Sequence, residues 1–237
     1  FSDSPLSMTE SSYHKASAII MKKAMATEFN HLTVYDISGN LQMFAHRQTP
    51  DSYKFGFYKS PAIHLNVSKK GEPLDEGGWS STEASDGFEL DLKLDGAMPD
   101  KEQLFIRNKA GILCVEAIIP VFGTDYDDDD NLISVQYGVV HGLKEIDSAF
   151  MERLHLLTGM SVNLFAGSTL SMGQIDSYNA IELNNLENDD LAKQTIKVSV
   201  QGETFYAKLL PTKSQTGLSG AVAMLQSNDI VNFPVVF

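Results

Sequence analysis

The densest group of side chains able to do chemistry is an acidic run in which five aspartates fall between Asp125 and Asp130 and are followed by Asn131. Carboxylate and amide oxygens are the ligands that hard cations such as Ca²⁺ prefer. The run lacks, however, the spaced glycine and the closing glutamate of an EF-hand loop. We therefore favour a solvated loop between two strands over a cation site.

Other patterns that would support catalysis or cofactor binding do not occur in the sequence. The chain has no Gly-x-Ser-x-Gly elbow, Walker loop or dinucleotide fingerprint. Its single cysteine, Cys114, lies in the apolar run 112–122 without an activating neighbour. The histidines show no HExxH pattern and no pair at helical ligand spacing; they are His14, His31, His46, His64, His141 and His155. We therefore expect a chain that is not an enzyme and that uses neither a metal nor another cofactor.

Polar side chains set among apolar ones are better candidates, because a small-molecule pocket is mostly apolar with a few polar groups that fix orientation. Arg107 is expected to share a strand face with Phe105, and Tyr137 to share one with Val135 and Val139. Each could project a polar tip into a cavity. Arg107 would then pair with an anionic ligand.

Three further candidates, Trp79, Tyr58 and His64, lie in a loosely patterned region that could supply an aromatic lid. For all five candidates, ordinary packing in the core or at its rim is the alternative. Glu116 interrupts an apolar strand and requires a partner if it points inward. A salt bridge between Glu116 and Arg107 would weaken the ligand hypothesis for both.

The elements that must position these residues begin with a helix. Ser7 and Glu10 match a capping box, and apolar residues continue at helical spacing to about Asn30. A hairpin is predicted next, with strands at 32–36 and 41–46 around a Gly/Asn turn. Helix followed by hairpin is thus the first unit of the chain.

The region from Gln48 to Gln103 is punctuated by glycine and proline and is predicted to hold loops and short elements, such as those at 62–67 and 88–92. Three antiparallel strands are predicted after it, at 104–108, 112–122 and 132–141.

The same order of elements then returns. An apolar stripe predicts a helix from about Lys144, with Gly159 as its C-terminal cap. A hairpin is predicted at 162–170, and a polar gap extends through Lys193. Three strands are expected near 196–200, 204–211 and 218–226. A repeat of about 100 residues suits two tandem domains of one fold, with a boundary near 143–147.

Three segments carry a resemblance to a known family: 32–41, which reads LTVYDISGNL, the passage from Val135 to Met160, and the closing 218–227, LSGAVAMLQS. Residues 156–162, LLTGMSV, are similar to the helix-to-strand entry of many membrane-proximal modules. The chain resembles the PAS-like Cache fold, and the tandem pair resembles the double Cache sensors of histidine kinases, chemoreceptors and diguanylate cyclases.

The resemblance implies an α+β fold of two tandem PAS-like (Cache) modules, each an antiparallel sheet of about five strands preceded by a helix. The parts would be an N-terminal helix, a membrane-distal module, a membrane-proximal module and an exit toward a transmembrane helix, at 1–30, 31–145, 146–228 and 229–237. The chain does not align onto the Tyr, Arg, Trp, Asp arrangement of the amino-acid-binding Cache sensors, so an amino-acid ligand is not expected. A first helix of about 22 residues would be ~33 Å long, shorter than one that runs beside both modules.

Composition limits the classes of partner that the chain can bind. The 237 residues allow two domains, and 18 Lys and Arg against 31 Asp and Glu give a net charge of −13, which disfavours nucleic acid. No apolar stretch is long enough to span a bilayer. The chain starts at Phe1 and ends in the apolar residues 233–237, so we expect it to be a segment of a longer, membrane-tethered protein.

The expected function is that of an extracytoplasmic, periplasmic sensor domain. It would bind a small and possibly anionic molecule in the distal module and relay the change across the membrane, as a homodimer tethered by flanking helices, to a histidine kinase. The alternative outputs are a chemoreceptor or a diguanylate cyclase. The alternative role is a spacer or dimerisation ectodomain without a ligand, and an orphan enzyme domain is a third hypothesis.

Overall fold

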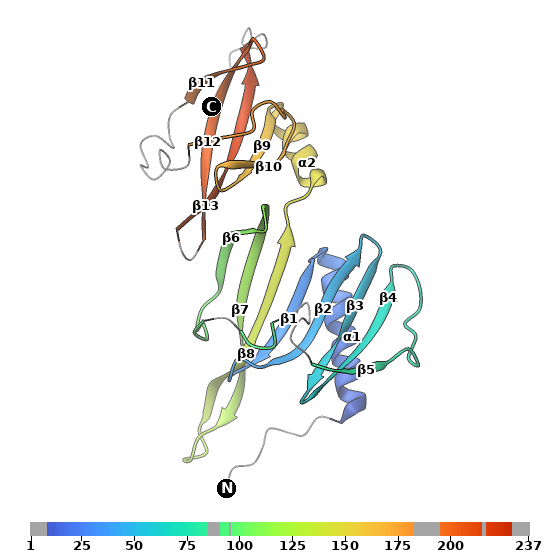
Figure 1. Ribbon diagram of the computed structural model, residues 1–237. Helices are drawn as coiled ribbons and strands as arrows, with labels where there is room; N and C mark the ends of the chain where they lie inside the picture. Colours follow the sequence, from blue (N-terminus) through green and yellow to red (C-terminus); the bar gives the residue numbers. More distant parts are fainter. Residues whose placement is uncertain (1–8, 85–90, 95, 183–194, 215–216, 229–237) are drawn as a thin grey trace. The chain divides into compact units, whose positions relative to one another are not determined.

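The computed structural model describes residues 9–84, 91–94, 96–182, 195–214 and 217–228 (Figure 1). The predicted exit segment 229–237 and the first residues of the predicted N-terminal helix lie outside the described residues. By their contacts, the residues group into two compact units, Phe1–Leu104 with Glu116–Lys144 and Phe105–Val115 with Glu145–Phe237. Neither helix of the described residues has the length and apolarity required to cross a membrane.

The described residues up to Glu145 fold into one helix and eight strands. They are α1 (Glu10–Thr27), β1 (His31–Asp36), β2 (Leu41–Thr49), β3 (Ser52–Lys59), β4 (Ala62–Lys69), β5 (Ser80–Glu83), β6 (Gln103–Lys109), β7 (Ile112–Tyr126) and β8 (Leu132–Glu145). The strands form one sheet in the order β5-β4-β3-β2-β1-β8-β7-β6. Five pairings of this sheet have a described register, and all five are antiparallel.

Helix α1 starts later than predicted. Thr9 caps it by accepting a hydrogen bond from the backbone N–H of Ser12 at 3.3 Å, and the chain leaves the helix through Glu28 in the left-handed region. The helix packs one face on the sheet through Ala18, Met21 and Ala24. On the sheet, this layer is completed by Leu32, Ala45, Tyr53 and Phe55.

The prediction of loops and short elements between Gln48 and Gln103 did not include β3, whereas the element predicted at 62–67 lies in β4. Most of the element predicted at 88–92 lies outside the described residues. Strands β3 and β4 are eight residues long each and extend the sheet beyond β2. In β3, Tyr53, Phe55 and Phe57 alternate with Lys54 and Tyr58, so both faces of the strand are covered. Four of the glycine and proline residues that indicated loops, Gly71, Pro73, Gly77 and Gly78, lie between β4 and β5.

The second part holds α2 (Ser148–Thr158), β9 (Ser161–Ala166), β10 (Thr169–Gly173), β11 (Thr195–Val200), β12 (Glu203–Ser214) and β13 (Gly217–Ser227). Asp147 caps α2 by accepting from the N–H of Phe150 at 2.9 Å. Gly159 ends the helix at φ 68°, which confirms the predicted cap. The sheet order is β10-β9-β13-β12-β11.

The two sheets share one strand order when the hairpin after α1 is matched with the hairpin after α2. In that match, β2-β1-β8-β7-β6 corresponds to β10-β9-β13-β12-β11. The predicted fold class, α+β with two tandem PAS-like modules, is confirmed. The second sheet has the expected five strands, and the first has eight because β3, β4 and β5 are added at its edge.

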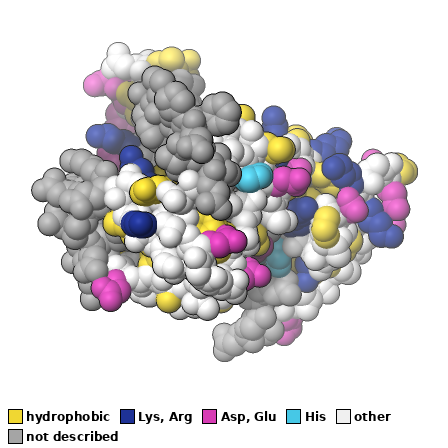
Figure 2. All heavy atoms as spheres, turned by 90° about the horizontal axis from the view of Figure 1, so that it is seen from above, with side chains coloured by type: hydrophobic (Ala, Val, Ile, Leu, Met, Phe, Trp, Pro, Cys, Tyr) yellow, Lys and Arg dark blue, Asp and Glu magenta, His cyan; other side chains and the backbone are white. Residues whose placement is uncertain are grey.

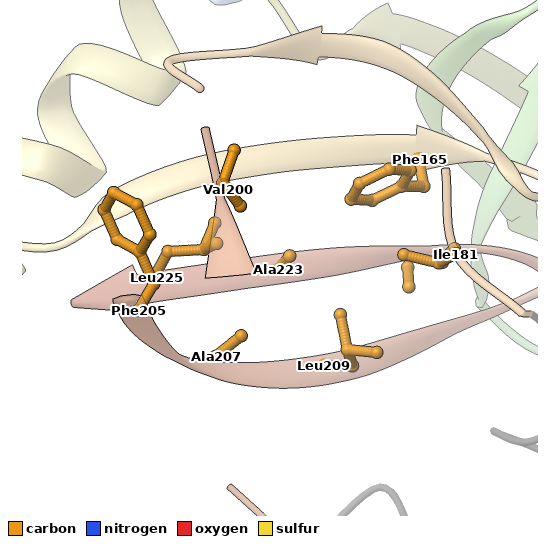
Figure 3. Close-up of a cluster of buried hydrophobic side chains, with 9 residues drawn as sticks. Phe165, Ile181, Val200, Phe205, Ala207, Leu209, Ala223 and Leu225 are labelled. Atoms are coloured by element: carbon orange, nitrogen blue, oxygen red, sulfur yellow. The ribbon is translucent and has the colours of Figure 1, made fainter. Parts of the chain in front are cut away.

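Each unit has its own core. In the second unit, Phe165, Phe205, Leu209 and Leu225 lead a buried cluster on one face of the sheet (Figure 3). Met151 of α2 belongs to another buried cluster, together with Val162 and Leu164.

Candidate functional site

A hollow in the first unit lies between α1 and the segment that leads into β5. It has a volume of about 500 Å³, which suits a small molecule. Helix α1 lines it with Ser11, His14, Lys15, Ala18, Ile19 and Lys22, and the facing segment lines it with Leu74, Glu76 and Trp79. We refer to it as the α1 cavity.

The helix places its part of the lining by simple periodicity. Ser11, Lys15, Ala18, Ile19 and Lys22 recur at intervals of three and four residues, so they share one stripe of α1. The adjacent stripe is buried against the sheet. One helix therefore contributes to the core with one face and to the cavity with the next.

Hydrogen bonds to Asp75 hold the facing segment. The buried Asn66 side chain of β4 donates to the Asp75 carbonyl at 2.7 Å, and the N–H of Gly77 donates to the Asp75 carboxylate at 3.0 Å. These bonds lie between the two lining residues Leu74 and Trp79. The Asn66 bond fixes the wall of the cavity to the sheet, and the Gly77 bond closes a turn within the wall.

Aromatic rings build the floor. Trp79 stacks on His14 with the ring centroids 4.1 Å apart and the planes at 12°. The indole also meets Phe55 edge-on at 5.4 Å and Phe57 at 5.7 Å. Because both phenylalanines are fully buried in β3, the Trp79 ring is anchored to the core and not only to the loop that carries it.

The His14 ring is held by stacking and not by a hydrogen bond. Its Nε2 atom is buried and has no hydrogen-bond partner among the described residues. The nearest charged atom recorded for it is a Glu10 carboxylate oxygen at 3.9 Å, which is too long for a hydrogen bond.

The charges that line the α1 cavity differ from those of the whole chain. Lys15 and Lys22 face one carboxylate, Glu76, whereas the chain carries a net charge of −13. On the face of the molecule shown in Figure 2, basic and acidic side chains are interspersed, and neither kind forms one continuous patch. The excess of lysine at the cavity is therefore a local feature that favours an anion.

The structure brings two of the five predicted site residues together. Trp79 lines the cavity, and His64 stacks on Phe57 at 4.6 Å, so both rings contact the same buried phenylalanine. Tyr58 packs in a different cluster, with Tyr35 and Phe44.

The other two predicted residues lie elsewhere. Tyr137 is 48% exposed on β8, where its hydroxyl donates to the Thr124 carbonyl at 3.5 Å. Arg107 is exposed on β6 and belongs to the second unit. Glu116, which needed a partner, is buried and lies 2.8 Å from Nε2 of His141. Ligand contact by any of the five residues stays a prediction.

Sequence reasoning missed the helical half of the site. His14 was treated as one of six scattered histidines, and Lys15 and Lys22 were not considered. The available signal was the stripe of Ser11, Lys15 and Ile19 beside the apolar stripe of α1. Only the fold shows that this second stripe faces Trp79.

Another buried cluster of described side chains lies between the first sheet and the covering residues Leu92 and Leu94. Tyr35, Phe44 and Val139 are buried there, and Leu92 and Leu94 pack on them. The Tyr35 hydroxyl donates to the Asp91 carbonyl at 3.1 Å. Burial raises the pKa of this phenol, so Tyr35 stays a neutral donor that ties the covering segment down.

A smaller groove lies on the second sheet and has a volume of about 240 Å³. Its lining comes mainly from β12 and β13 and comprises Met160, Thr195, Tyr206, Lys208, Leu210, Met224 and Gln226. It is half the size of the α1 cavity and holds one charged residue, Lys208.

The acidic run forms the turn between β7 and β8. Asp127 accepts hydrogen bonds from the N–H groups of Asn131 at 2.8 Å and Asp129 at 3.0 Å. Among the residues that the structure describes, no three His, Cys, Asp or Glu side chains gather so as to hold a metal.

Comparisons with known proteins give structural neighbours only. No family model and no curated protein sequence matches the chain. The ligand-binding domain of the Pseudomonas fluorescens chemoreceptor CtaA, solved with L-serine, is 12% identical, with 91% of this chain and 80% of that chain covered and a TM-score of 0.43.

Two other solved structures are similar to the same degree. The ligand-binding domain of the Campylobacter jejuni chemoreceptor Tlp3, in complex with 4-methylisoleucine, is 12% identical over 97% of this chain and 78% of that one, with a TM-score of 0.42. A domain of a sensory box/GGDEF family protein from Vibrio parahaemolyticus is 10% identical over 93% of this chain and 80% of that one, with a TM-score of 0.44.

Proposed function

We propose that this chain is a sensor domain that binds a small anionic molecule in the α1 cavity. The observation that carries the proposal is a cavity of about 500 Å³ lined by a stacked His14–Trp79 pair and two lysines. An anchored aromatic floor suits a planar or apolar ligand body, and the lysines suit its charged group. Glu76 would select against ligands with a second negative charge close to the first.

The position of the site suggests how binding would be relayed. One wall is α1, which also packs on β1, β2 and β3, and the other wall is the segment fixed by Asp75. A ligand that contacts both walls stabilises whichever arrangement of α1 brings them together. It shifts the balance only by its difference in affinity for the two arrangements.

The setting of the domain is part of the proposal. We propose an extracytoplasmic, periplasmic location, with a distal module at 31–145, a proximal module at 146–228 and an exit segment at 229–237 that leads to a membrane helix. The full receptor would be a homodimer with a histidine kinase as output, or else a chemoreceptor or diguanylate cyclase. The support is the repeated strand order of the two sheets and the resemblance of the sequence to double Cache sensors.

A second candidate function is a spacer without a ligand. It is favoured by the way each sheet buries its own side chains, Tyr35 and Phe44 in the first unit and Phe165 and Leu209 in the second. In that case the α1 cavity would be an unused surface hollow.

Thermal denaturation in the presence of a library of metabolites and carboxylates separates the two functions. A ligand at 100 times its dissociation constant adds about 2.7 kcal/mol of stability. We expect a shift with an anionic ligand, and we expect the K15Q/K22Q variant to lose most of it because both cavity cations are removed.

The matched control is Lys23→Gln, since Lys23 is an exposed neighbour on α1 that does not line the cavity. The control should keep the full shift. If no compound stabilises the wild-type chain, or if K15Q/K22Q responds like the wild type, the proposed site is wrong and the spacer is favoured.

A further inference from the structure

The hairpin of β7 and β8 exposes an unusual number of large apolar side chains near its turn. Between residues 119 and 137, seven of them are 38–67% exposed: Ile119, Val121, Phe122, Tyr126, Leu132, Ile133 and Tyr137. In the described residues, the core clusters reach Ile118 on β7 and Val139 on β8 and include none of these seven. This part of the hairpin is therefore an apolar surface outside the core.

Both faces of the ribbon take part. Neighbours along a strand point to opposite faces, so Val121 and Phe122 are exposed on different sides, as are Leu132 and Ile133. The Tyr137 ring lies over Gly123, where any added Cβ would overlap it. In Figure 1, β7 and β8 continue past the ends of the strands beside β8. Apolar side chains are thus available for contact on both faces of the hairpin.

The end of the hairpin is strongly acidic and ordered. The N–H of Asp127 donates to the Asn131 carbonyl at 3.0 Å, and the Asp127 carboxylate accepts from two N–H groups of the same turn. The backbone hydrogen bond from Asn131 holds the pKa of the Asp127 carboxyl below its ordinary value. Around it, the side chains of Asp125, Asp128, Asp129 and Asp130 are exposed. A fixed cluster of negative charge therefore borders the apolar ribbon.

An exposed apolar patch with a charged rim is typical of a binding surface. Three occupants can be compared by charge. A second copy of this chain would bring another net charge of −13 and another acidic turn. An anionic lipid surface would repel the turn. A protein with an apolar groove bordered by basic residues complements both features.

We propose that the tip of the β7–β8 hairpin, residues 119–137, is the docking element for a separate protein whose apolar groove is rimmed by Lys and Arg. The apolar ribbon supplies the buried contact. The acidic turn raises the rate of association and selects the partner. This surface shares no residue with the α1 cavity, so the two proposals rest on different residues.

The first test places a photo-reactive benzoylphenylalanine at position 122 or 126. The labelled protein is expressed in the cell that naturally contains it and is cross-linked there. The control position is Leu156 of α2, which is 76% exposed and lies outside the hairpin. We expect one protein to cross-link at 122 and 126 and not at 156. Absence of a hairpin-specific product would overturn the proposal, and so would a cross-link to a second copy of the chain.

The second test uses the cross-linked protein after purification. Its affinity should fall at least tenfold for the F122S/L132S variant and for the D128N/D129N/D130N variant, and it should weaken with added salt. Ile37→Ser, at an exposed apolar residue outside the hairpin, is the matched control and should bind like the wild type. Equal affinity of all variants contradicts the docking role. So does flotation of the wild-type chain with phosphatidylglycerol vesicles, because it would identify a lipid as the occupant.

Discussion

At the residue scale, the candidate site depends on side chains that serve the core and the cavity together. Trp79 stacks on His14 in the cavity and meets Phe55 and Phe57 in the core. Loss of its ring would therefore remove a ligand contact and a packing contact in one step. Lys15 and Lys22 belong to the cavity alone, which is why they are the better test of binding.

Tyr53 is the residue that ties the end of α1 to the sheet. Its buried hydroxyl donates to the carbonyls of Ala24 at 3.3 Å and Phe29 at 3.1 Å. We expect Tyr53→Phe to lower the free energy of unfolding by about 0.5–1.5 kcal/mol, measured by urea denaturation at pH 8. Tyr126→Phe, at a 67% exposed tyrosine, should change it by less than about 0.5 kcal/mol.

The same tyrosine predicts a dependence on alkaline pH. Burial raises the pKa of Tyr53 above its ordinary value of 10.0. A group whose pKa is raised in the folded state contributes stability that is complete below the unfolded pKa and is lost as the pH rises through the folded one. The difference in stability between wild type and Tyr53→Phe should therefore shrink above about pH 10. A constant difference between pH 8 and pH 11 would exclude this linkage.

At the scale of elements, the sequence predicted what local patterns can encode. The cap at Gly159, the strands of the second sheet and the strands β7 and β8 were located from turn residues and apolar runs. Strand β3 was missed because glycine and proline punctuate the region from Gln48 to Gln103, although Tyr53, Phe55 and Phe57 already showed the period of a strand. The partnership of α1 with Trp79 was beyond such reasoning, since it joins residues about 65 positions apart through the added strands.

The close pairing of β3 with β4 can be tested at Gly56. An added Cβ there would overlap the backbone carbonyl oxygen of His64 on β4. We expect Gly56→Ala to cost about 1–3 kcal/mol of stability, because neither backbone can move without disturbing the sheet. Gly71→Ala is the comparison, since its Cβ would meet no atom within 4 Å and only its positive φ of 84° is unfavourable. A smaller loss at Gly56 than at Gly71 would show that β3 and β4 are not paired this closely.

At the scale of the whole molecule, two cores without shared residues imply two stability units. Phe165 is fully buried in the second unit, and Phe44 is fully buried in the first. Phe165→Ala should cost its own unit about 3–5 kcal/mol. Hydrogen exchange followed by mass spectrometry should then show faster exchange in β12 and β13, with β2 and β3 unchanged.

The reciprocal variant, Phe44→Ala, should speed exchange in β2 and β3 and leave β12 and β13 protected. Exchange in β6 and β7 is the most informative, because the boundary between the two units falls within β7, between Val115 and Glu116. If both variants accelerate exchange in all four strands equally, the chain unfolds as one cooperative body. A ligand in the α1 cavity would in that case stabilise both sheets, and the thermal shift would report on the whole chain instead of on the unit that binds.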